Sequence, residues 1–392
     1  MRTRRRLLAP TDTESAFLDE PVGGAGGTPS GPDTTELPIL SRRRIVRTLL
    51  VVALLIVAIY FLVPELIGLG DALGKLDDAD PGWIGIAVGF TVLAFATYAA
   101  LFRGVVGGDV LQLRWGEAYE ITMAGLAATR FFAAGGAGGI VLSYWALRKA
   151  GMQPREVGRR MIAFLVLQYT FYPLALIVFG ILLRTDVLPG KDSVELTIVP
   201  AAIAGVLLAI GILIALIPKD VERRIAQFAQ GHRRAGLAQR LATIPATVGE
   251  GVRVAFGLIL HPSRGGLAVL GAAGFWAANV GILWASFKAF GVEVPIAVVV
   301  QGFFLGMVAN LFPFAPGGVG AVDAGMIGAF VLFGLPDESI FPAVLTYRVI
   351  AFWLPIPPGI VAFFQLRKRV ARWEREGLPV VRAQLRSAQP VV

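Results

Sequence analysis

The sequence contains no cysteine, so disulfide bonds, thiol catalysis and cysteine-based metal sites are excluded together. Histidine is scarce: His232 and His261 are the only two, and both fall in a predicted loop, where a lone imidazole is solvated rather than bound to metal. The signatures of phosphate-binding loops, serine hydrolases and zinc proteases are also missing. We therefore expect no metal site, no cofactor and no enzymatic activity.

Charged side chains are also few, at 16% of the residues, whereas hydrophobic ones make up 56% and the mean hydropathy is +0.70. A soluble domain has no room to hide so much apolar surface, and several runs reach the roughly 20 apolar residues that cross a bilayer core. The sequence therefore predicts an all-α polytopic membrane helix bundle. The net charge of +9 comes from basic residues beside these runs, which is typical of cytoplasmic loops and not of a nucleic-acid-binding patch.

The basic residues also predict the domain organisation and the orientation. Residues 1–41 have almost no apolar periodicity and are expected to be a disordered cytoplasmic tail. A transmembrane domain follows over 42–370, beginning with an uncleaved anchor at Val46–Leu66, and residues 371–392 form a second cytoplasmic tail. This arrangement places the chain in the cell membrane with both termini in the cytoplasm.

Five further spans are predicted, with alternating direction, and a basic cytoplasmic loop is predicted over 218–264. The spans are Trp83–Phe102 inward, Met161–Leu183 outward, Thr197–Ile217 inward, Gly265–Phe290 outward and Ile340–Phe364 inward.

Two more hydrophobic segments are interrupted by glycine and proline. Tyr119–Leu147 is split by AAGGAGG at 133–139, and Pro295–Gly334 is split by NLFPFAPGGVGAVD at 310–323. Each is either a re-entrant hairpin or a pair of short spans, and the charges place both ends of the first inside and both ends of the second outside. The stretches 83–183 and 265–364 then have opposite orientation, which predicts the inverted-topology repeat common in transporters.

The second break also carries residues suited to an anion. Gly317, Gly318 and Gly320 leave backbone N–H groups that can face a lipid phosphate, although glycines also serve close helix packing. Asp323 lies in the first turn of the following helix. It is either a capping carboxylate or an intramembrane acid that pairs with a base.

Arg348 is the expected partner of Asp323, because it lies too deep in its helix for its side chain to reach the headgroups easily. An inward-facing guanidinium at this position can also fork a lipid phosphate. Arg130 is its counterpart beside the first glycine run, with a snorkel towards the cytoplasmic headgroups as the alternative. Gln168, Asn279, Gln301 and Asn310 are expected to form hydrogen bonds between helices.

The run from Asn310 to Pro336 and the later TYRVIAFWLPIPPGIVAFF resemble the lysylphosphatidylglycerol synthase transmembrane family, over roughly residues 45–370. The resemblance implies a lipid-binding site and departs from the family pattern twice, with Asp323 in place of the usual Glu and Ile140 in place of an acid. We expect the site to comprise Arg130, Gly135, Gly136, Asn310, Pro313, Pro316, Gly317, Gly318, Gly320, Asp323, Tyr347 and Arg348.

The resemblance implies a stand-alone protein without the aminoacyl transferase of bifunctional relatives. It would bind and flip an anionic phospholipid or a polyprenyl-phosphate-linked lipid, with membrane lipids as its partners. One alternative is a membrane subunit or enzyme acting on lipid-linked sugars, together with proteins of envelope synthesis. Another is a scaffold that recruits partners through its basic loop and tails.

Overall fold

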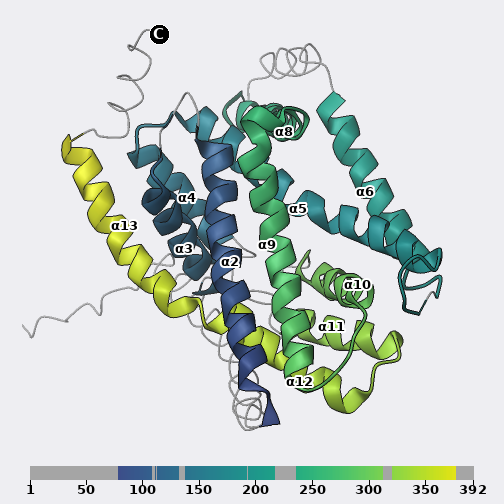
Figure 1. The fold of residues 1–392 in the computed structure, drawn as a ribbon. Helices are drawn as coiled ribbons and strands as arrows, with labels where there is room; N and C mark the ends of the chain where they lie inside the picture. Colours follow the sequence, from purple (N-terminus) through teal and green to yellow (C-terminus); the bar gives the residue numbers. More distant parts are fainter. Residues whose placement is uncertain are drawn as a thin grey trace, which may run out of the picture. The chain divides into compact units, whose positions relative to one another are not determined.

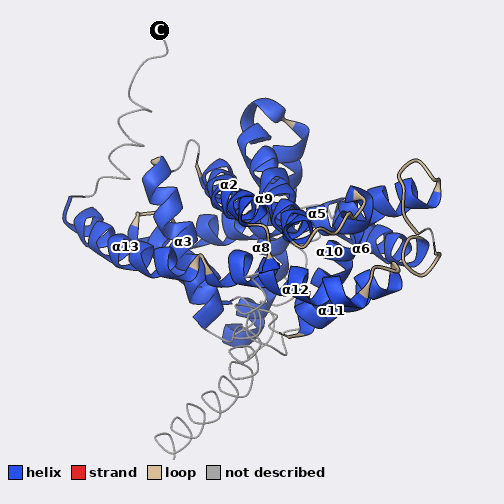
Figure 2. Ribbon diagram, turned by 60° about the horizontal axis from the view of Figure 1, so that its bottom comes forward, coloured by secondary structure: helices blue, strands red, loops and turns tan. Residues whose placement is uncertain are grey.

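The structure, a computed structural model, describes residues 78–107, 111, 113–131, 137–191, 193–216, 235–311 and 320–376. The predicted anchor Val46–Leu66 and the tail 1–41 lie outside these residues, as does most of the tail 371–392. Within the described ranges the regular elements are all helices and no strand occurs (Figure 2). The all-α prediction is confirmed.

The described helices follow one another along the chain as labelled in Figure 1. They are α2 Pro81–Val106, α3 Trp115–Phe131, α4 Ala137–Lys149, α5 Pro154–Arg184, α6 Ile198–Leu216, α8 Ala235–Leu260, α9 Pro262–Ala289, α10 Ile296–Met307, the 3₁₀ helix η2 Val308–Leu311, α11 Ala321–Leu332, α12 Asp337–Arg348, the π-helix η4 Val349–Trp353 and α13 Ile356–Glu376.

Four described helices are long and apolar enough to cross a membrane: Pro81–Val106, Pro154–Arg184, Pro262–Ala289 and the continuous stretch Glu338–Arg375. Three of them begin with a proline in the first turn, where its missing N–H removes no helical hydrogen bond. The prediction of a polytopic membrane helix bundle is confirmed. The predicted basic loop 218–264 is different in detail, since its described part contains helix α8, which packs against α5 through Gly251 and Ile162.

Helices α2 and α9 lie side by side along most of their length (Figure 1). Gly104 contacts Ala268, Gly271 contacts Leu101, and Gly281 contacts Phe90 further along the pair. Residue numbers rise along one helix as they fall along the other, so the pair is antiparallel, as the charge-derived orientations of these two spans require. Small residues at the contacts let the two backbones approach closely.

Each broken segment is a pair of antiparallel helices. In the first, Gly139 on α4 lies against Gly125 on α3, and the Gly139 N–H donates to Thr129 Oγ1 at 3.0 Å. In the second, Gly306 on α10 lies against Gly325 on α11. Re-entry into the membrane and the inverted repeat remain predictions.

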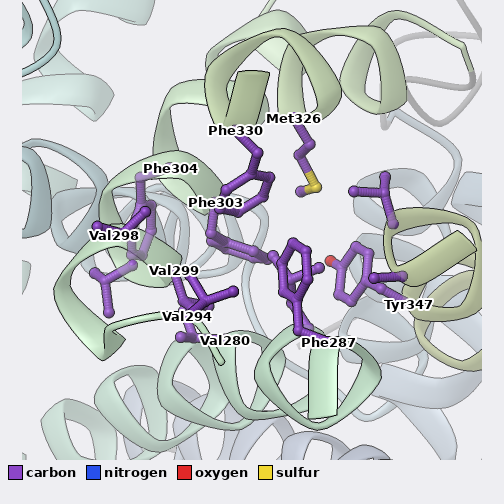
Figure 3. Close-up of a cluster of buried hydrophobic side chains, with 14 of the residues drawn as sticks. Val280, Phe287, Val294, Val298, Val299, Phe303, Phe304, Met326, Phe330 and Tyr347 are labelled. Carbon is purple, nitrogen blue, oxygen red and sulfur yellow. The ribbon is translucent and has the colours of Figure 1, made fainter. Parts of the chain in front are cut away.

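Two hydrophobic clusters form the core. One joins α2, α3, α4, the first half of α5 and α13, with residues of α8 and α9. The other joins α9 to α12 with the second half of α5, and Figure 3 shows its aromatic rings converging from several helices. The rings of Phe303 and Tyr347 lie 5.8 Å apart there, and those of Phe287 and Phe330 4.9 Å apart. The candidate site lies where the two clusters meet.

The close contact between α2 and α9 generates the first testable prediction. A Cβ atom at Gly271 would lie 2.4 Å from the backbone nitrogen of Leu101, so Gly271→Ala forces the helices apart. We expect a loss of about 1–3 kcal/mol in stability, measured as a lower thermal midpoint of the purified protein in detergent. Gly266→Ala on the same helix meets no atom within 4 Å and should leave the midpoint unchanged. Equal midpoints for the two variants would contradict this packing.

Candidate functional site

A cavity of about 400 Å³ lies between the two hydrophobic clusters. Its wall combines a few polar groups with many aromatic rings, contributed by α2, α3, α4, α5, α9, α10, α11, α12 and η4. The charged residues on this wall are Arg130 and Arg348. Known ligand pockets are typically walled in the same way, by apolar groups with a small number of placed polar ones.

Asp323 and Arg348 form an ion pair beside the cavity, with Asp323 Oδ1 at 3.4 Å from Arg348 Nε. The Arg348 side chain is 7% exposed and that of Asp323 is 21% exposed. The partner predicted from the depth of Arg348 is therefore the partner in the structure. The 3.4 Å separation is long for a charge-assisted hydrogen bond, as the shorter side chain of Asp makes reasonable.

The same carboxylate also caps a helix. Gly320 precedes α11 with φ at +77°, a conformation that glycine adopts without strain, and its N–H donates to Asp323 Oδ2 at 3.1 Å. Asp323 thus combines the two roles considered from the sequence: Oδ2 caps the helix and Oδ1 pairs with Arg348. The Gly320 N–H, expected to face a ligand, is engaged with Asp323.

Arg130 occupies an unexpected position. Its guanidinium reaches from α3 to the π-helix η4, donating to the carbonyl of Phe352 and, through Nη2, to that of Ala351 at 2.9 Å. Helical donors are scarce at this point, because Pro355, the α-register donor for Ala351, and Pro357, the π-register donor for Phe352, have no N–H, and the one N–H of Ile356 is left for both carbonyls. The snorkel towards the headgroups is therefore not the arrangement seen.

The two arginines meet at one aromatic ring. The guanidinium carbon of Arg130 lies 4.8 Å from the centroid of Phe352, and that of Arg348 lies 4.6 Å from it. Such cation–π contacts stabilise buried cations. With Asp323 as the carboxylate of this cluster, two positive charges stand against one negative charge among the described residues around the cavity. The cluster therefore has an electrostatic preference for an anion.

Aromatic and amide groups form another part of the wall. Trp276 donates from Nε1 to the backbone oxygen of Gln168 at 2.8 Å, and its ring lies 4.7 Å from that of Tyr172. The side-chain oxygen of Gln168 is buried without a hydrogen-bond partner in the described part of the chain. Asn279 bonds within its own helix, to Phe275, so the interhelical bond predicted for it is wrong. Gln301 does bond between segments, to Leu196.

A second ion pair holds the last helix in place. Both Arg369 nitrogens Nε and Nη2 donate to the carboxylate of Glu120 on α3, at 2.6 and 2.5 Å. Glu120 is buried, at 6% exposure. Local sequence does not single out this pair, because basic residues after a last span are typical of its cytoplasmic end whatever their partners are. Gly359 also lies against Ala127 on α3, so the two helices are in contact along their length.

The remaining predicted site residues divide into two groups. Tyr347 lines the cavity and is buried at 3% exposure against Phe303. Asn310 belongs to the 3₁₀ helix η2, but its side chain is outside the described part of the structure. The others also lie outside the described residues, namely Gly135, Gly136, Pro313, Pro316, Gly317 and Gly318.

Comparison with known protein families identifies the family of this chain. Residues 48–359 match the model of the family described as lysylphosphatidylglycerol synthase TM region. The chain belongs to this family. The match contains all the described cavity residues, including the two arginines and the broken helices around them.

Members of the family that resemble the chain include UPF0104 membrane proteins from Methanothermobacter thermautotrophicus. One is 34% identical over 79 residues, which is 20% of this chain and 24% of the relative. A second is 30% identical over 87 residues, 22% of this chain and 26% of the relative. The aligned part thus spans about a quarter of each relative.

The ion pair at the site can be tested by its contribution to stability. Asp323→Asn leaves Arg348 without its carboxylate, and breaking a buried pair from one side costs about 3 kcal/mol or more. We expect a clearly lower thermal midpoint in detergent. Asp323→Glu keeps the charge and the preferred capping residue at this helix position, so its midpoint should match that of the unmodified protein. A stable Asn variant would show that the pair contributes nothing.

The capping role of Arg130 predicts a double-mutant effect. Arg130→Met removes both donors to the η4 carbonyls and should destabilise the protein by about 1–3 kcal/mol per orphaned carbonyl. Pro355→Ala supplies a backbone N–H for Ala351, so it should recover part of the loss in the Arg130→Met background and much less in the unmodified protein. Thermal unfolding of the four proteins measures this coupling. Additive effects would exclude the proposed capping.

Proposed function

We propose that this membrane protein binds the anionic headgroup of a lipid in the cavity and translocates that lipid across the bilayer. The observation that carries the proposal is the excess positive charge of Arg130 and Arg348 over Asp323 inside a cavity walled by apolar rings. A buried net charge is costly in a medium of low dielectric constant. A phosphate diester in the cavity would supply the missing negative charge.

Arginine suits this ligand by geometry as well as by charge. A guanidinium presents several N–H donors in one plane, and these match two oxygens of a phosphate. Arg348 uses Nε towards Asp323, which holds the head of the side chain in place beside the cavity. Asp323 would then tune and orient Arg348, and it would not contact the phosphate itself.

The rest of the wall suits the remainder of a polar headgroup. The cavity of about 400 Å³ has room for roughly a dozen water molecules at about 30 Å³ each, which is adequate for a headgroup. The side-chain oxygen of Gln168, which has no hydrogen-bond partner among the described residues, would accept a hydrogen bond from a headgroup hydroxyl or amine. Aromatic rings such as Trp276 also suit the face of a sugar, so polyprenyl-phosphate-linked sugars remain within the proposed class of lipid.

We further propose that the chain is not itself an enzyme. The competing function, processing of a lipid-linked sugar, needs a base, and Asp323 is the carboxylate at the site. One of its oxygens accepts from the Gly320 N–H and the other faces Arg348, so both oxygens are engaged within the protein and neither is positioned to take a proton from a substrate. Residence in the cell membrane, cytoplasmic termini and association with proteins of envelope synthesis belong to the same proposal.

Reconstitution in vesicles tests the proposal. Purified protein in vesicles of phosphatidylcholine and phosphatidylglycerol, with fluorescent phosphatidylglycerol as probe, should accelerate movement of the probe between leaflets relative to protein-free vesicles. Arg348→Ala removes a charged donor to the phosphate, whose contribution of about 1.5–3 kcal/mol corresponds to roughly a 10- to 100-fold loss in binding. Native mass spectrometry of the same variant should show less retained phosphatidylglycerol.

Arg367→Ala is the matched control, because Arg367 is an exposed residue of α13 that lies away from the cavity wall. It removes the same charge and should leave both measurements unchanged. The proposal is wrong if the unmodified protein moves the probe no faster than empty vesicles and retains no lipid. It is also wrong if the two arginine variants behave alike.

A further inference from the structure

The cavity opens to the outside between α4 and α5. Ile140 on α4 and Tyr169 on α5 both line the cavity, yet they are 38% and 44% exposed. They are the most exposed of the described residues on its wall. Ser143 and Gln168, close to them on the same helices, are buried at 6% exposure each. The two exposed side chains therefore mark a mouth with a polar interior directly behind it.

The mouth lies deep along the two helices. Ile140 is eight residues before Arg148, and Tyr169 is nine residues after Arg160, which are distances of about 12 and 14 Å at about 1.5 Å per residue. These arginines belong to the basic end that the charge distribution places in the cytoplasm. A hydrocarbon core is about 30 Å thick, so a position 12 to 14 Å below a cytoplasmic edge is near its middle. The mouth faces acyl chains at this depth.

The surface around the mouth agrees with this location. Val141 and Tyr144 on α4 are 65% and 39% exposed, and Leu174 on α5 is 40% exposed. No charged side chain occurs on α4 before Arg148 or on α5 between Arg160 and Arg184. Such a surface is solvated by hydrocarbon at no cost, whereas in water it would be an exposed apolar patch.

The size of the cavity decides how a lipid can use this mouth. Acyl chains reach about 15 Å, half of the roughly 30 Å core, so two of them do not fit beside a headgroup in 400 Å³. We propose that the gap between α4 and α5 is a lateral door. The anionic headgroup of a two-chain lipid passes between Ile140 and Tyr169 to reach Arg348, while its acyl chains stay outside in the hydrocarbon. This inference rests on the proposed function and adds the route to it.

The absence of cysteine from the chain makes a direct test available. Ile140→Cys and Tyr169→Cys each place one thiol at the mouth, and a bulky methanethiosulfonate reagent then blocks the gap. In the vesicles with fluorescent phosphatidylglycerol, the modified proteins should fall to the rate of protein-free vesicles. A reducing agent removes the blocking group and should restore the original rate, which excludes misfolding as the cause.

Matched controls come from neighbouring residues. Val141→Cys and Leu174→Cys are equally accessible from the hydrocarbon but lie off the cavity wall. Their modification should leave the rate unchanged. The amount of phosphatidylglycerol retained in native mass spectrometry gives a second readout, because modification before exposure to lipid should prevent loading only in the Ile140→Cys and Tyr169→Cys proteins.

The outcomes separate the two proposals. If the unmodified protein neither moves nor retains phosphatidylglycerol, the proposed function fails and the door fails with it. If the unmodified protein is active and the modified Ile140→Cys and Tyr169→Cys proteins keep both rate and loading, the site stands and the door is refuted. Equal inhibition at all four positions would also refute the door, because it would show a general effect of the reagent.

Discussion

The arrangement of the site depends on how the backbone carbonyl groups next to the prolines of the last membrane helix obtain hydrogen-bond donors. Pro355, Pro357 and Pro358 leave carbonyl groups without helical donors, and in a bilayer such groups need partners within the protein. Arg130 supplies the donors from another helix and thereby fixes α3 against the π-helix η4. A π-helix is uncommon and frequently occurs at functional sites. Here it aims the ring of Phe352 at two guanidinium groups.

A chain of polar contacts connects this constraint to the second broken segment. Arg348 is the last residue of α12 and pairs with Asp323 on α11. Asp323 in turn accepts a hydrogen bond from the N–H of Gly320, at the edge of the second broken segment. Arg130 lies near the end of α3, just before the first glycine run, and connects this helix to η4. Further along α13, Arg369 pairs with Glu120 and holds α13 against α3. The cavity is therefore surrounded by elements that share their polar partners, so displacement of one break changes the environment of both arginines.

Much of this fold could be predicted from the sequence, and the limits have physical reasons. Apolar runs and flanking basic residues predicted the four long spans and the antiparallel relation of α2 and α9, because length and charge act locally, whereas the predicted span Thr197–Ile217 is a shorter apolar helix. The Asp323–Arg348 pair could be predicted because an ion deep in a membrane helix needs a partner. The roles of Arg130 and Glu120 could not, since each depends on a contact more than 200 residues away along the chain. The prolines at 355 and 357 were the available signal for Arg130.

The substitution of Asp for Glu at position 323 has a consistent place in this arrangement. The shorter side chain still reaches both Gly320 and Arg348, although the latter contact is long at 3.4 Å. A long ion pair constrains the guanidinium less than a bidentate one does, as the tighter pair between Glu120 and Arg369 illustrates in the same protein. The structure thus contains one bidentate ion pair suited to holding helices together and another, longer pair whose arginine lines the cavity. Under the proposed function, an anionic headgroup would therefore meet a guanidinium that Asp323 orients through one long contact and does not enclose.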